Sequence, residues 1–253
     1  MKLDQILQML DTQMEVAKLL EESFRSFYND ESLDDASWLS LSMASKFLWL
    51  HEVFSALWDK NIAFEEVISK YRPQYGSFSP SMFEEIIQAA IFIVLGKYFD
   101  TTKGSHDEGI DLILSEEVET TIGIEYTATS IVQCKLYRNV VPVSELRDFF
   151  GVMVARAATG YFFTTASFTK QAVEKFMPLA NSSSLANKLF VVADKEIYSI
   201  LAVCNAIASE VVDSYLSGHD ADIEEIEENR QRAKALMHSS IPIQQDIFER
   251  KWP

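Results

Sequence analysis

Glycine and proline are scarce in this sequence, and cysteine is scarcer still. The 253 residues contain 8 Gly, 6 Pro and 2 Cys. So few chain breakers exclude a loop-rich protein and favour long regular elements. The two thiols, Cys134 and Cys204, lie far apart in the sequence and have no metal-binding spacing. This excludes a disulfide framework and indicates a reduced, cytoplasmic environment.

Long apolar runs are also missing. The first twenty residues mix acidic with apolar side chains, which is unlike a signal peptide. No stretch approaches the roughly 18 to 20 apolar residues that are needed to span a bilayer. Hydrophobic residues nevertheless make up 48% of the chain and charged residues 24%, which suits a packed core. We therefore expect a soluble cytoplasmic protein with no membrane partner.

The sequence also has few positively charged residues relative to negatively charged ones. The chain has 22 Lys and Arg against 38 Asp and Glu, a net charge of −16. Nucleic-acid binding relies on Lys and Arg that displace counterions from phosphates. A nucleic-acid surface must therefore be a local patch, be assisted by bound cations, or come from a protein partner or a homo-oligomer. Carboxylates are, in contrast, the ligands that hard metal ions require.

The spacing of apolar residues divides the chain into three parts. Helical spacing runs through residues 1–76 and ends near a linker candidate at 72–81, which is rich in Pro and Ser. Strand-like and helical stretches alternate through residues 77–198. Helical spacing returns in residues 199–253, where an acidic stretch is read as an exposed helix.

The middle part predicts an α/β domain. A helix starts at Pro80 and continues to Gly96, with Ser79 as its cap. Two further helices are expected at 143–158 and 169–177. Strands are expected at 110–114, 122–126, 131–137, 161–165 and 189–192. Strands that alternate with helices indicate a mixed central sheet flanked by helices, here with helical N-terminal and C-terminal extensions.

An aspartate stands where an acidic loop meets the first of these strands. The loop at 104–109 is punctuated by glycine, and Asp111 follows it at the start of the strand. Burying a carboxylate there is costly unless a cation or a hydrogen-bond donor accompanies it. Asp111 is interpreted either as a metal ligand or as a structural residue that caps a turn or pairs with a surface lysine, and the strand downstream favours the ligand. His106 and Asp107 are read as loop residues rather than as ligands.

Two polar side chains share one face of the expected strand at 131–137. Side chains alternate along a strand, so Gln133 and Lys135 lie on one face and Cys134 on the other. A lysine inside such a strand needs a carboxylate partner. The alternatives are that Lys135 is an edge-strand lysine that discourages aggregation, and that Gln133 faces solvent. Glu125, on the preceding strand, is read as an exposed strand residue.

These residue types suit metal-assisted hydrolysis of a phosphodiester. Asp111 would bind Mg²⁺ through its carboxylate, and the metal would activate a water and stabilise charge on the phosphate. Lys135 would orient or deprotonate the water, or neutralise the transition state. Gln133 offers an oxygen to the metal and an amide to position water. The pair Thr164-Thr165, at a strand end, is read either as a phosphate contact or as packing.

Residues 83–176 resemble the Mrr-like family of restriction endonucleases, which has the PD-(D/E)xK nuclease fold. The pieces that carry the resemblance stand in this order: Phe83-Glu84-Glu85, Asp107-Glu108-Gly109-Ile110-Asp111, Val132-Gln133-Cys134-Lys135, residues 145–151, Gly160 to Thr165, and Ser167-Phe168-Thr169. The sequence departs from the family pattern directly after Lys135, where the family often has an arginine and this sequence has Leu136. The flanking helical parts match nothing in that pattern.

The resemblance implies a Mg²⁺-dependent endonuclease that cuts DNA, with Mn²⁺ as an alternative metal, in bacterial defence against foreign DNA. It implies that Asp111 is the catalytic aspartate, that Gln133 fills the acid-or-glutamine position and that Lys135 is the lysine. Of the helical pair Glu84 and Glu85, it favours Glu84 as the third metal ligand beside Asp111 and Gln133.

Two other functions remain open from the sequence. The first is a binding or assembly subunit that kept the nuclease fold without its activity. The second is an RNA-directed nuclease of the same fold. Metal binding separates the first from an active enzyme, and parallel assays on DNA and RNA separate the second. The target sequence is not predicted.

Overall fold

The computed structural model describes residues 35–58, 80–102, 109–119, 123, 125–137, 140–175 and 188–238. Contacts divide the chain into two compact units. The helical unit comprises Met1–Lys97 with Leu201–Ala233, and the sheet unit comprises Tyr98–Ile200 with Lys234–Pro253. The domain boundaries expected from the sequence, 1–76, 77–198 and 199–253, stay predictions, because this division reflects contacts and not independently folding segments.

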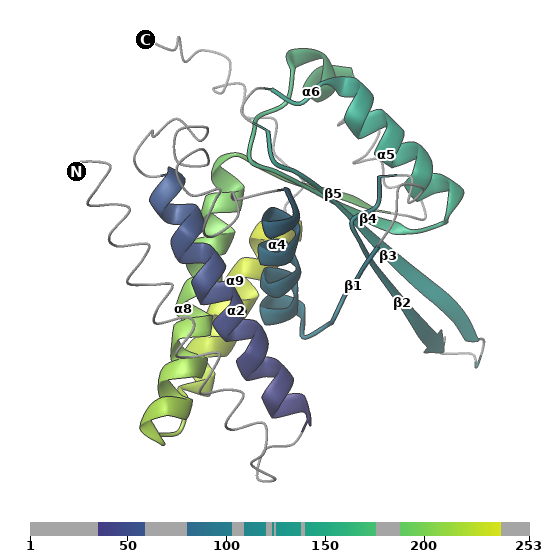
Figure 1. The fold of residues 1–253 in the computed structure, drawn as a ribbon. Helices are drawn as coiled ribbons and strands as arrows, with labels where there is room; N and C mark the ends of the chain where they lie inside the picture. The colour runs from purple at the N-terminus through teal and green to yellow at the C-terminus, as the bar shows by residue number, and fades with distance from the viewer. Residues whose placement is uncertain are drawn as a thin grey trace. The chain divides into compact units, whose positions relative to one another are not determined.

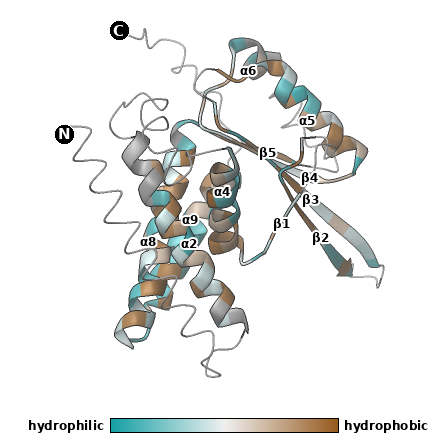
Figure 2. Cartoon of the chain, viewed as in Figure 1, coloured by the Kyte–Doolittle hydropathy of each residue, from teal (hydrophilic) through white to brown (hydrophobic). Residues whose placement is uncertain are grey.

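The helical unit contains α2 (Asp35–Trp58), α4 (Pro80–Leu95), most of α8 (Lys195–Ser217) and most of α9 (Ile223–His238). Helix α4 begins at the expected proline, whose missing N–H costs nothing in a first turn. It is buried along most of its length and is largely brown in Figure 2. The Phe54 and Phe83 rings stack 6.2 Å apart between α2 and α4. Of the helical region expected at 1–76, the structure describes only residues 35–58, and the rest of it and most of the linker candidate lie outside the described residues.

Helix α8 is the one helix in the described part of the chain that is long and apolar enough to cross a membrane by length and composition alone. The sequence predicted helical spacing here but no membrane-spanning stretch, because Asn205, Ser209 and Glu210 interrupt the apolar run. Its most apolar window is 44% buried within the structure. The core helix of a soluble protein passes the same test, so the finding is weak support for a membrane span.

The sheet unit is built on five strands among the described residues, in the order β1-β2-β3-β4-β5 (Figure 1). The strands are β1 (Asp100–Thr101), β2 (Leu112–Glu119), β3 (Glu125–Lys135), β4 (Thr159–Thr164) and β5 (Leu189–Ala193). The first three pair antiparallel and the last three pair parallel. A parallel pair needs a crossover, and α5 (Val143–Ala155) supplies it between β3 and β4. The predicted α/β class with a mixed sheet is confirmed.

The core of the sheet unit lies between α5 and one face of the sheet. Leu146, Phe149 and Met153 recur at helical spacing on the buried side of α5. The Phe149 and Phe162 rings meet edge to face, with centroids 5.6 Å apart. A Cβ atom at Gly160 would lie 2.7 Å from the Met153 sulfur, so this glycine lets α5 approach β4 closely. These contacts hold the middle and the last turn of α5 against β4.

Two strand predictions were wrong in the same place. The structure has one eleven-residue strand, β3, where the sequence predicted separate strands at 122–126 and 131–137. The polar residues at 127–130 suggested a break, but threonine suits a half-exposed strand. β2 and β3 also extend beyond the rest of the sheet as a two-stranded ribbon (Figure 1), whose outer pairs include Glu119 and Glu125. The exposed position of Glu125 confirms its reading as a surface residue.

The strand predicted at 110–114 is β2, which begins two residues later and continues to Glu119. The other elements of the sheet unit follow their predictions more closely. The helices expected at 143–158 and 169–177 are α5 and α6 (Lys170–Lys175), and the strands expected at 161–165 and 189–192 are β4 and β5. The acidic stretch after Gly218 forms α9, whose first turn is exposed as expected. Strand β1 was not predicted, because two residues are too few to carry a periodic pattern.

Candidate active site

Asp111 lies just before β2, bonded to the end of β3. Its backbone N–H donates to the Val132 carbonyl at 2.8 Å, and its carboxylate Oδ2 accepts from the Cys134 N–H at 2.5 Å. On the other side, its carbonyl accepts from the Thr102 N–H at 3.0 Å. The segment before β2 is thus held on both sides, and the carboxylate lies against the backbone one residue before Lys135.

Gln133 is enclosed beside this aspartate. Its side chain is 5% exposed, and its Oε1 has no hydrogen-bond partner among the residues that the structure describes. Gly109 has a positive φ of 78°, and a Cβ atom there would lie 2.7 Å from Gln133 Nε2. The glycine therefore brings the end of the acidic loop directly onto the amide. A buried oxygen without a donor is the kind of group that a water or a cation satisfies.

Lys135 follows on the same face of β3 and has the carboxylate partner that the sequence required. Its Nζ lies 3.3 Å from Oε2 of Glu145, in the first turn of α5, and the two side chains are 26% and 31% exposed. The Tyr137 hydroxyl donates to the other oxygen, Oε1, at 3.1 Å. Sequence reasoning missed Glu145 as a site residue. An acidic side chain in the first turn of the helix after the lysine strand was the signal available.

The Tyr137 hydroxyl keeps its proton in this cluster. Burial and the neighbouring Glu145 carboxylate raise the pKa of Tyr137 above its usual 10.0, while Lys135 acts in the opposite direction. The phenol is therefore a hydrogen-bond donor to Glu145 throughout the neutral range.

Thr165 and Thr164 serve the fold at the end of β4. The Thr165 hydroxyl donates to the Tyr137 carbonyl at 2.8 Å and accepts from the Tyr137 N–H at 3.0 Å. The Thr164 hydroxyl accepts from the Ala166 N–H at 3.2 Å, and both threonines are buried. These contacts favour strand-end packing over a phosphate contact for the pair.

The two glutamates of α4 lie in the helical unit. Glu85 forms an ion pair of 3.0 Å with Lys46 of α2, whose ammonium also lies 3.5 Å from the Gln88 amide oxygen. Glu85 is thus engaged within the helical unit. The assignment of Glu84, which is half-buried, as a metal ligand stays a prediction.

The donors that remain suit magnesium as a partial ligand set. In the described ranges, no group of three His, Cys, Asp or Glu side chains could hold a metal ion, and His106 and Asp107 lie outside those ranges. The aspartate carboxylate and the orphaned amide oxygen of Gln133 are hard oxygen donors. Mg²⁺ often takes only one or two protein carboxylates and completes its shell with water and substrate phosphate. The chemistry of Asp111 and Gln133 therefore fits this ion.

The mixed sheet, with antiparallel β1 to β3, parallel β3 to β5 and helices in the same unit, is consistent with a restriction-endonuclease-like fold. Residues 76–187 match the family model Mrr_cat, described as restriction endonuclease. This segment is accordingly an Mrr-like restriction endonuclease domain, and it includes Asp111, Gln133, Lys135 and Glu145. The comparisons with curated proteins and with solved structures found no match.

Proposed function

We propose that this protein is a Mg²⁺-dependent endonuclease that hydrolyses phosphodiester bonds of DNA and acts in bacterial defence against foreign DNA. The observation that carries the proposal is the hydrogen bond from the Cys134 N–H to the Asp111 carboxylate. It fixes an acid beside the strand that bears Gln133 and Lys135, within a segment that matches a restriction endonuclease family.

Each residue has a distinct role in the proposed reaction. Asp111 and Gln133 would hold Mg²⁺, with Glu84 as the third proposed ligand. When bound, the ion would supply a nucleophilic water at neutral pH and stabilise the charge on the phosphate. Lys135 would place its ammonium beside the phosphate oxygen or the attacking water and stabilise the developing negative charge. The Gln133 amide N–H groups would orient water.

The net charge of −16 bears on how such an enzyme would bind DNA. An acidic chain gains little from counterion release, which supplies most of the non-specific affinity for DNA. We propose that a protein partner or a second copy of this chain supplies basic surface, and that the enzyme works in the cytoplasm. The same acidity favours one rival, an inactive nuclease-fold subunit of a larger assembly.

A cleavage assay tests the proposal. Supercoiled plasmid, single-stranded DNA and RNA are incubated with the protein in Mg²⁺, in Mn²⁺ and in a chelator, and the Asp111→Asn variant is run in parallel. Nicking or linearisation of plasmid by wild type alone, dependent on the metal, is the expected result. Cleavage of RNA alone would favour the RNA-directed rival. Absence of metal-dependent cleavage on every substrate would favour the inactive subunit.

A further inference from the structure

We propose that Glu145 is a positioning residue that holds the Lys135 ammonium in place for the cleavage step, with Tyr137 fixing the orientation of the carboxylate. This inference rests on the proposed nuclease function, because it concerns the lysine of that site. It assigns to the first turn of α5 a role that lies outside the acid–glutamine–lysine set.

The carboxylate of Glu145 is held at both oxygens. Lys135 Nζ lies 3.3 Å from Oε2, and the Tyr137 hydroxyl donates to Oε1 at 3.1 Å. A lysine side chain has a flexible four-carbon stem and a compact charge, so its ammonium has no fixed position without a partner. A carboxylate that is oriented by a second donor gives the ammonium one preferred place.

Glu145 and Tyr137, which together define the position of the carboxylate, are themselves held in place. Glu145 directly precedes Leu146, which is fully buried in the core between α5 and the sheet. Tyr137 is fixed through its backbone, because the Thr165 hydroxyl accepts a hydrogen bond from its N–H and donates one to its carbonyl. The Thr165 N–H also donates to the Lys135 carbonyl at 3.3 Å. The position of the ammonium is therefore set by the packing of β3, β4 and α5.

Stability does not account for this arrangement. The Lys135 and Glu145 side chains are about one-quarter to one-third exposed, and ion pairs open to solvent contribute little to folding. The bond from the Tyr137 hydroxyl to Glu145 is one partly buried hydrogen bond, so it too contributes little to folding. Removal of the carboxylate should leave the fold intact, and its effect should appear in the chemical step. Misplacement of a catalytic group by about 1 Å can cost about a hundredfold in rate.

The contact has one competing interpretation, in which Glu145 masks Lys135 and restrains the enzyme. The two interpretations predict opposite signs. If Glu145 positions the ammonium, its removal slows cleavage; if Glu145 masks it, removal accelerates cleavage. The masking interpretation gives no role to the bond from Tyr137, whereas positioning uses both oxygens of the carboxylate.

The first test is single-turnover cleavage of plasmid DNA in Mg²⁺ by wild type, Glu145→Gln and Glu145→Asp, with DNA affinity measured separately without Mg²⁺. Asp148→Asn is the matched control, since Asp148 is an exposed acid of the same helix. Its Oδ1 lies 3.3 Å from Nε of the neighbouring Arg147. We expect Glu145→Gln to lower the single-turnover rate by about tenfold to a hundredfold with unchanged affinity and melting temperature. Glu145→Asp should recover part of the rate, and Asp148→Asn should match wild type.

The second test needs no activity. Lysine amines are labelled with an acetylating reagent, and the rates at Lys135 and at the exposed Lys170 are compared by mass spectrometry. Glu145→Gln should raise labelling of Lys135 several-fold relative to Lys170, because the amine is no longer held. An unchanged ratio would overturn the inference even if wild type cleaves nothing. A cleavage rate in Glu145→Gln equal to or above that of an active wild type would also overturn it, while failure of wild type on every substrate would refute the nuclease proposal itself.

Discussion

The backbone N–H of Cys134 donates to the carboxylate Oδ2 of Asp111 at 2.5 Å. The acid that the proposed chemistry needs for metal binding thus also satisfies a backbone donor in a buried strand. Cys134 is 7% exposed, so its N–H has little access to water. Because the carboxylate has this structural task, removal of the whole side chain would mix a loss of stability with a loss of function.

An isosteric change at Asp111 separates the two effects. Asp111→Asn keeps an oxygen for the Cys134 N–H and removes the negative charge, so we expect a melting temperature close to wild type and loss of cleavage. Asp111→Ala removes the carboxylate that accepts from the buried Cys134 N–H, at a cost of about 1 to 3 kcal/mol. Denaturant unfolding of both variants measures this difference. Equal unfolding free energies for the two variants would show that the hydrogen bond from the Cys134 N–H to Asp111 does not stabilise the fold.

Gln133 should contribute to function at the expense of stability. Its buried Oε1 lacks a partner among the described residues, and an unsatisfied buried polar atom is costly. Gln133→Leu, of similar shape, should therefore unfold at the same or a higher denaturant concentration, by up to about 1 kcal/mol, while cleavage is lost. Gln133→Glu should be destabilised in a chelator and stabilised by Mg²⁺, because a bound ion compensates the buried charge. Active Gln133→Leu enzyme would refute the assigned role.

Gly109 should be required because of its contact with the Gln133 amide. Alanine at this position meets two penalties, a left-handed backbone and a Cβ atom 2.7 Å from Gln133 Nε2. Gly96 is the matched control, since its φ is 67° and a Cβ atom there meets nothing within 4 Å. Both alanine variants should lose about 1 to 2 kcal/mol of stability from the backbone. Only Gly109→Ala should also lower the cleavage rate, and equal rates in the two would contradict the contact.

The parts of the site that depend on strand alternation could be predicted from the sequence. The alternation of apolar and polar residues around Gln133 and Lys135 puts both side chains on one face of the strand. The register of β3 with β4 agrees, since the two residues pair with Phe162 and Thr164, which are also two positions apart. The helix predicted at 143–158, which ends at Ala155 in the structure, was also visible in the sequence, because Leu146 and Phe149 recur at helical spacing. Local patterns of this kind need no knowledge of distant neighbours.

The contacts that cross elements could not be predicted in this way. The partner of Lys135 comes from α5, whose position depends on how Phe149 packs on β4. The length of β3 was underestimated, because its outer half pairs only with β2 and has Tyr126 as its one large side chain with apolar character. A short run of small and polar residues of this kind is a weak strand signal. Tertiary pairing decides such cases, and propensity alone does not.

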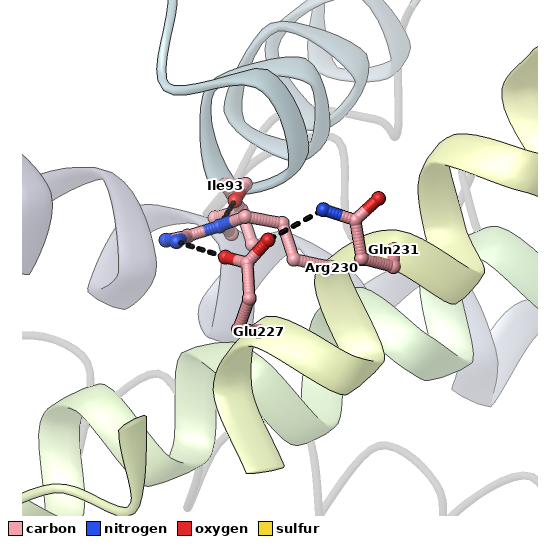
Figure 3. Close-up of polar contacts among 4 residues, drawn as sticks. All are labelled: Ile93, Glu227, Arg230 and Gln231. Atoms are coloured by element: carbon pink, nitrogen blue, oxygen red, sulfur yellow. Dashed lines mark hydrogen bonds and ion pairs between the residues drawn. The ribbon is translucent and has the colours of Figure 1, made fainter. Parts of the chain in front are cut away.

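Arg230 should stabilise the helical unit without affecting the chemistry. Figure 3 shows its side chain reaching from α9 to α4, where Nε donates to the Ile93 carbonyl at 3.0 Å. Ile93 is in the last turn of α4, where carbonyls lack partners within the helix. The guanidinium also lies 3.3 Å from Glu227, which accepts a second bond from Gln231 at 2.5 Å. Arg230 thus caps the C-terminal turn of α4, and Glu227 of its own helix, α9, orients its guanidinium.

Substitution of this arginine should therefore lower stability alone. We expect Arg230→Ala to lose about 1 to 2 kcal/mol in denaturant unfolding, from one charged hydrogen bond to a backbone carbonyl. Arg232→Ala, an exposed arginine on the same helix, should lose less than about 0.5 kcal/mol. The single-turnover rate at a temperature where both variants are folded should be unchanged. Equal stability of the two variants would contradict the capping role.

His238 should make the stability of the sheet unit depend on pH. Its ring packs against Phe190 at 4.7 Å and Tyr161 at 6.1 Å between centroids. His238 lies at the surface, and its partial burial against these rings lowers its pKa below the usual 6.5, with Lys188 and Lys234 adding to the effect. The folded protein therefore keeps the ring neutral at pH values where the unfolded chain is protonated. Stability should be fully present above about pH 6.5 and should fall as the pH decreases from there toward the lowered pKa.

This dependence can be isolated by a substitution. His238→Gln has no charge to gain, so its melting temperature should fall less between pH 7.5 and pH 5.5 than that of wild type. His219→Gln is the control, because His219 lies in an exposed turn. Its pH dependence should match wild type. Parallel curves for all three proteins would show that the His238 ring is not held neutral by its surroundings.

The central claim is that Asp111 and its neighbours on β3 share one divalent ion, and a calorimetric titration with Mn²⁺ tests it most directly. Wild type and Asp111→Asn are titrated under the same conditions, after unfolding measurements have shown equal stability. The account predicts one binding site in wild type that is lost in the variant. Identical isotherms, with or without a site, would contradict it.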